Sequence, residues 1–365
     1  MPDPQFAAPI LPGGMLIDAA AMAGVFLLWL FVGSMFLPGA RVAVEDAEGN
    51  PVSYRLNGLA LYLLTALAAA AAHLGGWFSL SALYSHFFAL FAVANLFAFA
   101  LSGWLYWRGA RKHRQHGFWR GFYYGTELNP SLLGVDLKMF SYRPSLIGLA
   151  LLNASFAVVQ YEETHGRITL AMALYQALGF IYVLNYFQFE RGMLRTWDIV
   201  SERFGWMLVW GDYALVPFFY CIAGWWLVDA AGPAMHPVFA AGIALLFGFG
   251  FWLFRGANSQ KDRFKNDPGA MIWGKPAESL DGRLLVSGFW GIGRHLNYTG
   301  EICIYLAFAL TTGFSSWVPY LLPAWIASLL WHRSRRDERR CRAKYGQLWA
   351  RYRQRVPCCM IPFVY

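Results

Sequence analysis

The chain has 365 residues, of which 58% are hydrophobic, 18% aromatic and only 14% charged, and its formal net charge is +9. Soluble domains carry roughly 25% charged residues, so this composition excludes an ordinary soluble protein and indicates a polytopic membrane protein. The positive charge does not favour nucleic-acid binding, because the cations alternate with apolar segments and no soluble module displays them.

Apolar runs of about 17 to 25 residues, long enough to cross a hydrocarbon core as helices, recur along the chain. The sequence predicts nine spans and allows a tenth within 109–142, and the nine begin near Met15, Asn57, Leu83, Leu146, Ile168, Trp206, Ala234, Tyr298 and Trp317. We therefore expect an all-α fold that forms one membrane-embedded domain over 1–365, with N-terminal helices over 15–160 and a functional half over 168–365.

Lysine and arginine gather at 108–120, 255–283 and 333–355, each next to the end of a span. The positive-inside tendency predicts that these segments face the cytoplasm. We expect a multi-pass protein of a bacterial inner membrane or of the endoplasmic reticulum. The side of the amino terminus stays open, because nine and ten spans place it on opposite sides.

The segment 125–140 is hydrophilic and contains Asn129-Pro130 and Gly134, which interrupt helices and predict a folded loop or a re-entrant turn. Its acids Glu127 and Asp136 are candidate proton donors. Asp212 is a stronger candidate, because a carboxyl that is desolvated at membrane depth can stay protonated near neutrality. The alternative is that a polar side chain of a neighbouring helix satisfies Asp212.

No metal site is expected, because the five cysteines lack the paired spacing of zinc or iron-sulfur ligands. The glycines 288, 291 and 293 do not indicate a Rossmann site, since no strand or βαβ unit accompanies them.

The carboxy-terminal stretch 332–365 predicts an amphipathic helix that is followed by an extended tail containing Pro357 and Pro362. Several side chains recur there at three- and four-residue steps and are expected to share a face: Asp337, Cys341, Lys344, Tyr345, Gln347, Leu348 and Tyr352. Such a face can bind the phosphates and ribose of a nucleotide, or it can simply rest on anionic lipid headgroups.

Two shorter patterns support a ligand site. Lys261 and Lys265 stand four residues apart and can clamp one phosphate, although lysines that flank a span have the same spacing. Arg294 and Glu301 lie where a span begins, and charges at a membrane boundary are costly unless they pair or contact a ligand.

Taken together, these motifs resemble the sterol reductase family, membrane enzymes that reduce sterol double bonds with NADPH. The resemblance covers roughly 120–365 and extends weakly to 54–58. It rests on Gly-Thr-Glu-Leu-Asn-Pro at 125–130, Asp-Leu-Lys-Met-Phe at 136–140, Thr-Trp-Asp-Ile at 196–199, Phe-Gly at 204–205, Gly-Asp at 211–212, Asn-Ser-Gln-Lys at 258–261, the run 284–298, and the run 336–346 with its Val-Pro and Ile-Pro sequels.

The resemblance implies about ten transmembrane helices and an NADPH pocket that opens to the cytoplasm. The family's cofactor contacts would fall on Lys261, Lys265, Leu285, Trp290, Asn297, Tyr298, Arg333, Asp337, Cys341, Arg342, Ala343, Lys344, Tyr345 and Tyr352. Lys265 departs from the arginine expected there, which removes a two-pronged phosphate contact and bears on the preference for NADPH over NADH.

The activity that the resemblance implies is protonation of a sterol alkene followed by hydride transfer. Asp212, Glu127 and Tyr298 are the candidate catalytic residues. The rings of Tyr182, Tyr186, Phe187, Trp206, Trp210 and Tyr213 are candidates for stabilising the cationic intermediate. A Δ14 bond is the preferred substrate, with Δ7 and Δ24(28) or Δ24 bonds as alternatives.

Two other classes remain as alternatives, an isoprenylcysteine-type membrane methyltransferase and a non-catalytic sterol-binding protein. The methyltransferases share an Arg-His-x-x-Tyr element but lack the 258–261 and 125–130 motifs. The expected partners are a sterol and membrane lipid, without nucleic acid, and the oligomeric state stays open.

Overall fold

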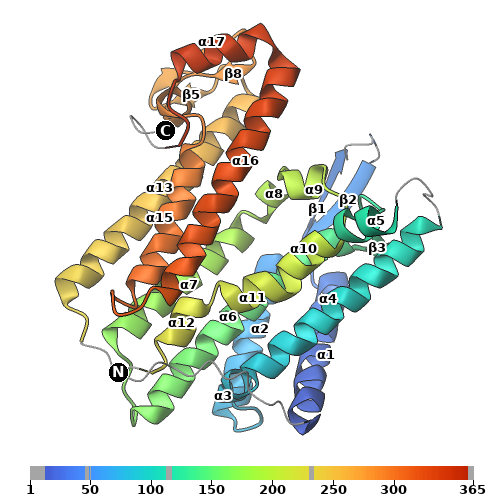
Figure 1. The fold of residues 1–365 in the computed structure, drawn as a ribbon, viewed down its shortest axis with the longest axis vertical. Coiled ribbons are helices and arrows are strands. Elements are labelled where there is room, and N and C mark those ends of the chain that lie inside the picture. The colour runs from blue at the N-terminus through green and yellow to red at the C-terminus, as the bar shows by residue number, and fades with distance from the viewer. Residues whose placement is uncertain (1–12, 46–48, 50, 112–116, 230–233, 361–365) are drawn as a thin grey trace. The chain divides into compact units, whose positions relative to one another are not determined.

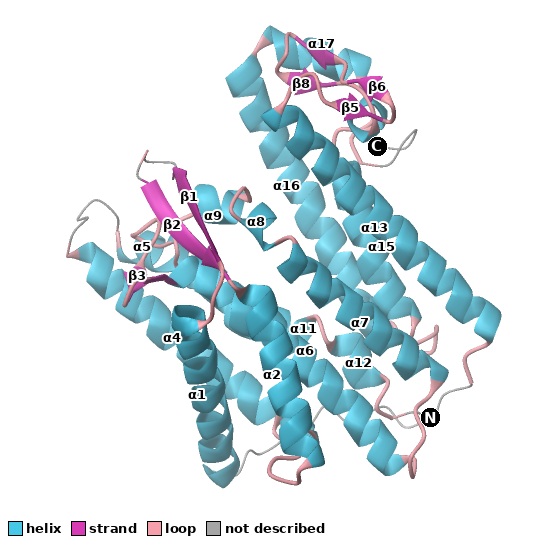
Figure 2. Cartoon of the chain, turned by 180° about the vertical axis from the view of Figure 1, so that it is seen from behind, coloured by secondary structure: helices cyan, strands magenta, loops and turns pink. Residues whose placement is uncertain are grey.

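The computed structural model describes residues 13–45, 49, 51–111, 117–229 and 234–360. The chain divides into two compact units, unit 1 (Met1–Ile168 with Gly179–Ala230) and unit 2 (Thr169–Leu178 with Ala231–Tyr365). Helices dominate both units (Figures 1 and 2). The expected single domain, with halves over 15–160 and 168–365, stays a prediction.

Unit 1 contains long helices joined by hairpins and short helices. Its elements are α1 (Gly13–Phe36), β1 (Ala40–Glu45), β2 (Pro51–Leu56), α2 (Gly58–Leu74), α3 (Ser81–Ser85), α4 (Phe87–Ala110), α5 (Phe118–Tyr124), β3 (Ser131–Leu132), β4 (Val135–Asp136), α6 (Leu137–Glu163), the second half of α7 (Leu170–Gln188), α8 (Glu190–Met193), α9 (Trp197–Val200), α10 (Trp206–Trp210), the π-helix η1 (Gly211–Leu215), α11 (Val216–Phe219) and α12 (Ile222–Trp226).

Unit 2 is built on three long helices that run alongside one another, α13 (Pro237–Asn266), α15 (Leu296–Leu310) and α16 (Leu321–Tyr345) (Figure 1). The first half of α7 also belongs to it. Its remaining elements are β5 (Met271–Ile272), β6 (Lys275–Pro276), β7 (Ser279–Leu280), β8 (Leu284–Leu285), α14 (Phe289–Ile292), the 3-10 helix η2 (Val318–Tyr320) and α17 (Gln347–Arg355).

The helices are those of a polytopic membrane protein. In the described part of the chain, six helical segments are long and apolar enough to cross a membrane: α1, α4, α6, α7, Trp206–Trp226 and α13. The helices α2 and α15 are apolar but shorter. A count of about ten spans is therefore not confirmed.

Two of the expected boundaries are wrong. The described residues of 109–142 that precede α6 form the end of α4, the short helix α5 and a hairpin, not a spanning helix. The next span begins at Leu137 rather than near Leu146, because Asp136 caps it and the carboxylate Oδ1 accepts a hydrogen bond from the amide of Met139 at 2.7 Å.

The fold is mostly helical rather than all-α, because short strands occur between the helices. The described residues include four antiparallel two-stranded sheets, β1–β2, β3–β4, β5–β6 and β7–β8. In β3–β4 both turn residues, Leu133 and Gly134, have positive φ (+49° and +80°), as a two-residue type I′ turn requires. This hairpin is the folded loop that the 125–140 segment predicts.

The expected amphipathic helix of the carboxy-terminal stretch is two helices. Helix α16 continues from an apolar segment into the charged run and ends at Tyr345, and α17 begins at Gln347. Gly346 separates them with φ of +54°, a left-handed conformation that ends helices and favours glycine. Lys344 therefore does not share a helix face with Tyr352. Pro362 of the expected tail lies outside the described residues.

Unit 1 has a buried polar junction where α1, β2 and α2 meet α6. The Asn57 side chain is 3% exposed, and its Nδ2 donates to the carbonyls of Gly33, Ser34 and Leu37 at the end of α1. Arg143 Nη2 donates to the carbonyl of Arg55 at 2.8 Å and lies 3.4 Å from Glu190 Oε1. The Asn57 amide thus supplies donors to carbonyls at the end of α1, and Arg143 joins β2 to α8 at the same junction.

Replacing Asn57 with alanine is expected to lower the free energy of unfolding by about 1 to 3 kcal/mol, because carbonyls at the end of α1 lose a buried side-chain donor. Thermal unfolding of the detergent-solubilised protein measures the effect. The control Asn266→Ala removes an exposed side chain and should leave the melting temperature nearly unchanged. Equal melting temperatures for both variants would contradict the capping role.

Candidate functional site

Five of the predicted or neighbouring site residues come together at one end of unit 2. Lys261 Nζ lies 4.5 Å from the centre of the Trp290 ring and interacts electrostatically with Asp337 and Cys341. The Cys341 thiol lies 3.9 Å from an oxygen of Asp337. Asp337 in turn lies 3.9 Å from His295. The ends of α13 and α16, α14 and the start of α15 thus supply one polar cluster.

An amide pair forms the inner side of this cluster. Asn297 Nδ2 donates to Asn258 Oδ1 at 3.2 Å, which joins the motifs at 258–261 and 284–298. The buried Oδ1 of Asn297 has no hydrogen-bond partner among the described residues. Tyr298 stacks on the His295 ring, with a centroid distance of 4.9 Å and an interplanar angle of 14°. A buried unpaired amide oxygen is costly, so it indicates a place where a ligand or water donates.

The chain end folds back onto the segment that carries these residues. Arg294, which is 6% exposed, donates through Nη1 to the carbonyls of Val356 and Pro357 at 2.7 and 2.8 Å. The amides of Arg294 and His295 donate to the carbonyls of Cys358 and Cys359. The extended tail expected after the helix therefore pairs with the start of α15, and it holds the Arg-His pair in position.

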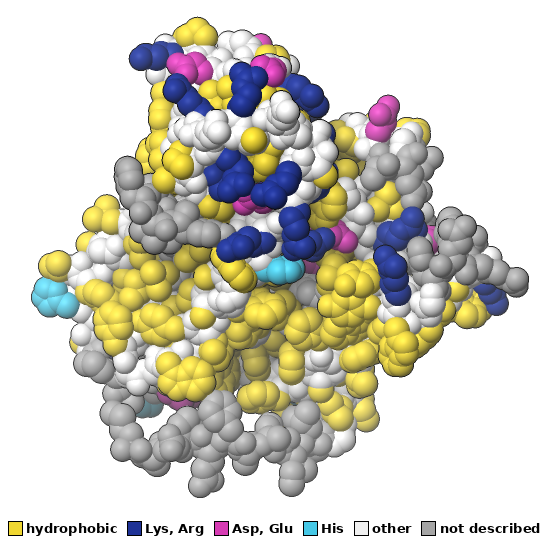
Figure 3. Space-filling view, turned by 45° about the horizontal axis from the view of Figure 1, so that its top comes forward, with side chains coloured by type: hydrophobic (Ala, Val, Ile, Leu, Met, Phe, Trp, Pro, Cys, Tyr) yellow, Lys and Arg dark blue, Asp and Glu magenta, His cyan; other side chains and the backbone are white. Residues whose placement is uncertain are grey.

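The electrostatics of the cluster leave His295 uncharged. Burial lowers the pKa of His295 to about 4, the nearby cations Lys261 and Arg294 act in the same direction, and Asp337 opposes them. Lys and Arg side chains gather over the end of unit 2 where α16 and α17 meet (Figure 3). A neutral imidazole and exposed cations beside a carboxylate suit a polar ligand that carries phosphate.

Several predicted cofactor contacts have other roles or lie apart in this structure. Leu285 is 6% exposed in a hydrophobic cluster with Ile272 and Phe289. Tyr352 is buried, and its hydroxyl donates to the carbonyl of Trp290 at 3.2 Å.

The remaining predicted contacts lie on the helices around the cluster. Lys265, Arg342, Ala343 and Lys344 are exposed, and Arg333 is half-buried. The half-buried Tyr345 has Arg283 over its ring at 5.1 Å and Lys344 at 5.3 Å.

The candidate acids Asp212 and Glu127 lie in unit 1 and differ in their surroundings. Asp212 is half-buried in η1, a π-helical turn of the kind often found at functional sites. Glu127 pairs with Arg108 at 3.2 Å and is 13% exposed, so its charge is already compensated. The two acids therefore differ in charge compensation, because Glu127 has an ion-pair partner and Asp212 has none among the described residues.

Unit 1 contains two pairs of electron-rich rings, one of them in α10 directly before η1. Trp206 and Trp210 stack at 5.5 Å, and Tyr182 and Tyr186 lie 5.0 Å apart. The Tyr213 hydroxyl accepts a hydrogen bond from Ser141 at 3.0 Å.

Sequence reasoning missed three interactions at the site, which involve Arg294, the Asn258–Asn297 pair and the His295–Asp337 pair. It noted Arg294 only as a costly boundary charge, and neither the Asn258–Asn297 pair nor the His295–Asp337 pair was predicted. The motifs contained all of these residues, but no spacing rule relates positions 39 or 42 residues apart.

The known proteins to which this chain is similar are named as enzymes of sterol biosynthesis. The model of the ergosterol biosynthesis ERG4/ERG24 family matches residues 11–365. A Delta(14)-sterol reductase of Methylotuvimicrobium alcaliphilum is 38% identical over 94% of this chain and 83% of its own length. A Delta(14)-sterol reductase of Arabidopsis thaliana is 38% identical over 93% of this chain and 94% of its own. A probable 7-dehydrocholesterol reductase of Acanthamoeba polyphaga mimivirus is 34% identical over 90% of this chain and 76% of its own.

The neutral state of His295 predicts a pH dependence of stability. An unfolded histidine takes up a proton near pH 6.5, whereas folded His295 resists protonation down to about pH 4. Stability should therefore fall as the pH decreases from 7 to 5. His295→Asn is expected to flatten this slope in melting temperature, whereas His332→Asn, at an exposed position, should keep it. An unchanged slope in His295→Asn would reject the buried neutral histidine.

Proposed function

Because the chain belongs to the ergosterol biosynthesis ERG4/ERG24 family, we propose that it is an integral membrane enzyme that reduces the Δ14 double bond of a sterol with NADPH. The similarity to Delta(14)-sterol reductases over more than nine-tenths of the chain carries this conclusion. The chain is an oxidoreductase that acts on a sterol carbon-carbon double bond. The choice of the Δ14 bond, NADPH as the cofactor and the residues below are proposals.

The polar cluster of unit 2 fits a nicotinamide dinucleotide. Lys261 offers a cation for phosphate, Asp337 an acceptor for hydroxyl or amide groups, and Asn297 Oδ1 an unpaired acceptor. In this proposal Trp290 and Tyr298 add aromatic surface, while Leu285 and Tyr352 support the cluster from behind. NADPH, when bound, supplies the hydride.

The acid is proposed to come from unit 1. A sterol alkene is not electrophilic, so one of its carbons has to be protonated before the other can accept hydride. Asp212 is the proposed proton donor, because it is half-buried and no carboxylate–cation pair involves it among the described residues. The rings of Trp206, Trp210 and Tyr213 are proposed to stabilise the tertiary cation by cation-π contact, at about 1 to 2 kcal/mol each.

The number of membrane spans and their orientation are also part of the proposal. About ten spans are proposed, which would include the shorter apolar helices α2 and α15, and the Lys- and Arg-rich end of unit 2 is proposed to face the cytoplasm. A Δ7 substrate is the second candidate, because a relative named as a probable 7-dehydrocholesterol reductase is 34% identical.

Incubation of the purified enzyme and NADPH with sterols that carry Δ14, Δ7 or Δ24 unsaturation tests the proposal directly. Mass spectrometry should detect loss of the Δ14 bond. Exclusive consumption of the Δ7 sterol would replace Δ14 by Δ7, and no consumption of any sterol by folded protein would reject the activity.

Asp337→Ala is expected to raise the KM for NADPH about ten- to a hundred-fold, because it removes a hydrogen bond to a charged acceptor. Steady-state kinetics at saturating sterol measure this, with Asp281→Ala as a matched exposed control. An unchanged KM in Asp337→Ala would reject the proposed pocket.

Asp212→Asn is expected to lower kcat by about a hundred-fold or more, because it removes the proton donor of the chemical step. NADPH binding, measured by fluorescence titration, should remain. The control is Asp229→Asn, an exposed carboxylate of the same unit. Full turnover in Asp212→Asn would transfer the role to Glu127 or to a tyrosine.

A further inference from the structure

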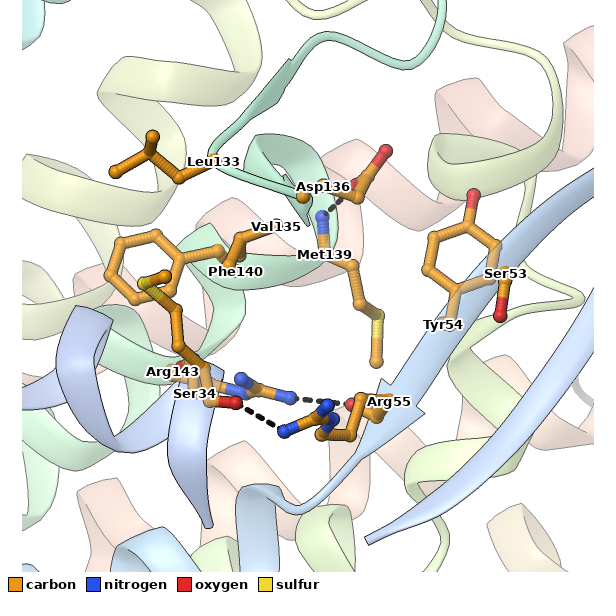
Figure 4. Close-up of a pocket in the computed structure, with 12 residues that line it drawn as sticks. Ser34, Ser53, Tyr54, Arg55, Leu133, Val135, Asp136, Met139, Phe140 and Arg143 are labelled. Carbon is orange, nitrogen blue, oxygen red and sulfur yellow. Dashed lines mark hydrogen bonds between the residues drawn. The ribbon is translucent and has the colours of Figure 1, made fainter. Parts of the chain in front are cut away.

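Unit 1 contains a cavity of about 240 Å³ that the proposed reduction does not use. It lies between the end of α1, strand β2, the β3–β4 hairpin and the first turns of α6 (Figure 4). Its lining includes Arg55, Asp136, Met139 and Arg143.

The cavity has opposite charges at its two ends. Figure 4 shows Asp136 at one end and Arg55 with Arg143 at the other, with Met139 between them. Asp136 and Arg143 are seven residues apart, which corresponds to about 10 Å of helix rise. The cavity is therefore a polar slot with an apolar middle.

Each end carries a buried polar atom without a partner. Arg143 is 3% exposed, and its Nε has no hydrogen-bond partner among the described residues. The buried Oδ2 of Asp136 likewise has none in the described part of the chain, although Oδ1 accepts from the Met139 amide. Because such atoms cost free energy when they stay unpaired, the cavity is prepared for a ligand that accepts at one end and donates at the other.

The charge at each end of the cavity indicates which charge a complementary ligand carries there. Glu190 compensates Arg143, whereas no carboxylate pairs with Arg55 among the described residues, so the arginine end is positive. Burial raises the pKa of Asp136 to about 6, against the opposing effects of the Met139 amide and Lys138, so its carboxyl is mainly ionised at pH 7. The complementary ligand has an anion for the arginines and a cationic donor for Asp136.

The volume of the cavity and its place in the fold indicate what kind of molecule carries this ligand group. Pockets for whole drug-sized molecules measure roughly 300 to 1,000 Å³, so this cavity suits a headgroup rather than an entire sterol. It lies at the ends of α1 and α6, both long and apolar enough to span a membrane. Lipid headgroups occupy that level of the bilayer.

We propose that this cavity binds the headgroup of a membrane lipid in which a phosphate is joined to a primary ammonium group. The phosphate accepts hydrogen bonds from Arg55 and Arg143, and the ammonium donates to Asp136. A quaternary ammonium lacks the N–H that Asp136 requires, and a headgroup with phosphate alone leaves Asp136 without a donor. The site is distinct from the polar cluster of unit 2.

Native mass spectrometry of the delipidated protein, titrated with phosphatidylethanolamine, phosphatidylcholine or phosphatidylglycerol of identical chains, tests this. Phosphatidylethanolamine should bind about ten-fold more tightly than the other two, as expected for one hydrogen bond between charged groups. Soluble phosphoethanolamine should compete only weakly. Equal affinity for the soluble compound and the lipid would overturn the lipid source.

Two variants separate the ends of the cavity. Asp136→Asn keeps an oxygen that caps α6, and it should remove the preference for phosphatidylethanolamine over phosphatidylcholine. Arg55→Gln should weaken both lipids about ten-fold, because it removes a cation that faces phosphate. Arg41→Gln is the matched control, since Arg41 lies opposite Arg55 in the β1–β2 register and outside the cavity lining.

The outcomes decide the proposal without reference to turnover. Identical affinities for the three lipids in the native protein would overturn it, as would an Asp136→Asn variant that keeps the full preference. A loss of binding in Arg41→Gln equal to that in Arg55→Gln would also overturn it, because the effect would then reflect surface charge alone.

Discussion

The buried guanidinium of Arg294 is the contact on which the polar end of unit 2 depends. The guanidinium donates through Nη1 to the backbone carbonyls of Val356 and Pro357, and its Nη2 lies 4.0 Å from Glu338 Oε2, while its Nε has no hydrogen-bond partner among the described residues. Those carbonyls belong to the chain end, so the compensation of one charge fixes the return of the tail. His295 follows directly in sequence and is thereby held beside Asp337.

Unit 1 also contains a buried cation, and a side chain from a distant part of the sequence compensates its charge. Arg143 is compensated by Glu190, and Glu190 also accepts a hydrogen bond from the amide of Gly58 at 3.0 Å. The start of α2, the first turns of α6 and α8 are thus joined through one carboxylate. In both units a charge that would be costly in an apolar setting instead specifies which segments meet.

The sequence was sufficient for the membrane class, the family and the residues from which a site could be built. Apolar runs predicted α1, α4, α7 and α13 because lipid requires long hydrophobic helices, and a long apolar run is visible without knowledge of neighbours. Hairpins such as β1–β2 were missed, because short strands between spans carry little periodic signal. The start of α6 was missed because Asp136 was interpreted as a loop residue and not as a cap.

The site shows the same division between local and long-range information. The family resemblance implied that Lys261, Trp290, Asn297 and Asp337 contact one ligand, and the structure does bring Lys261 to Trp290. The break at Gly346 was not foreseen, since a helix-compatible pattern continues through it and only the positive φ reveals the turn. The residues beyond it, Leu348 and Tyr352, consequently pack into the interior.

The π-helical turn η1 has a consequence for how this span tolerates change. A π turn accommodates one residue more than an α turn, so everything after Leu215 is rotated by about 100° relative to an uninterrupted α-helix. Deletion of one residue there would restore regular α-helical winding. The side chains of α11 and α12 would then point to a different side of the span. Natural variation in this stretch should therefore preserve its length.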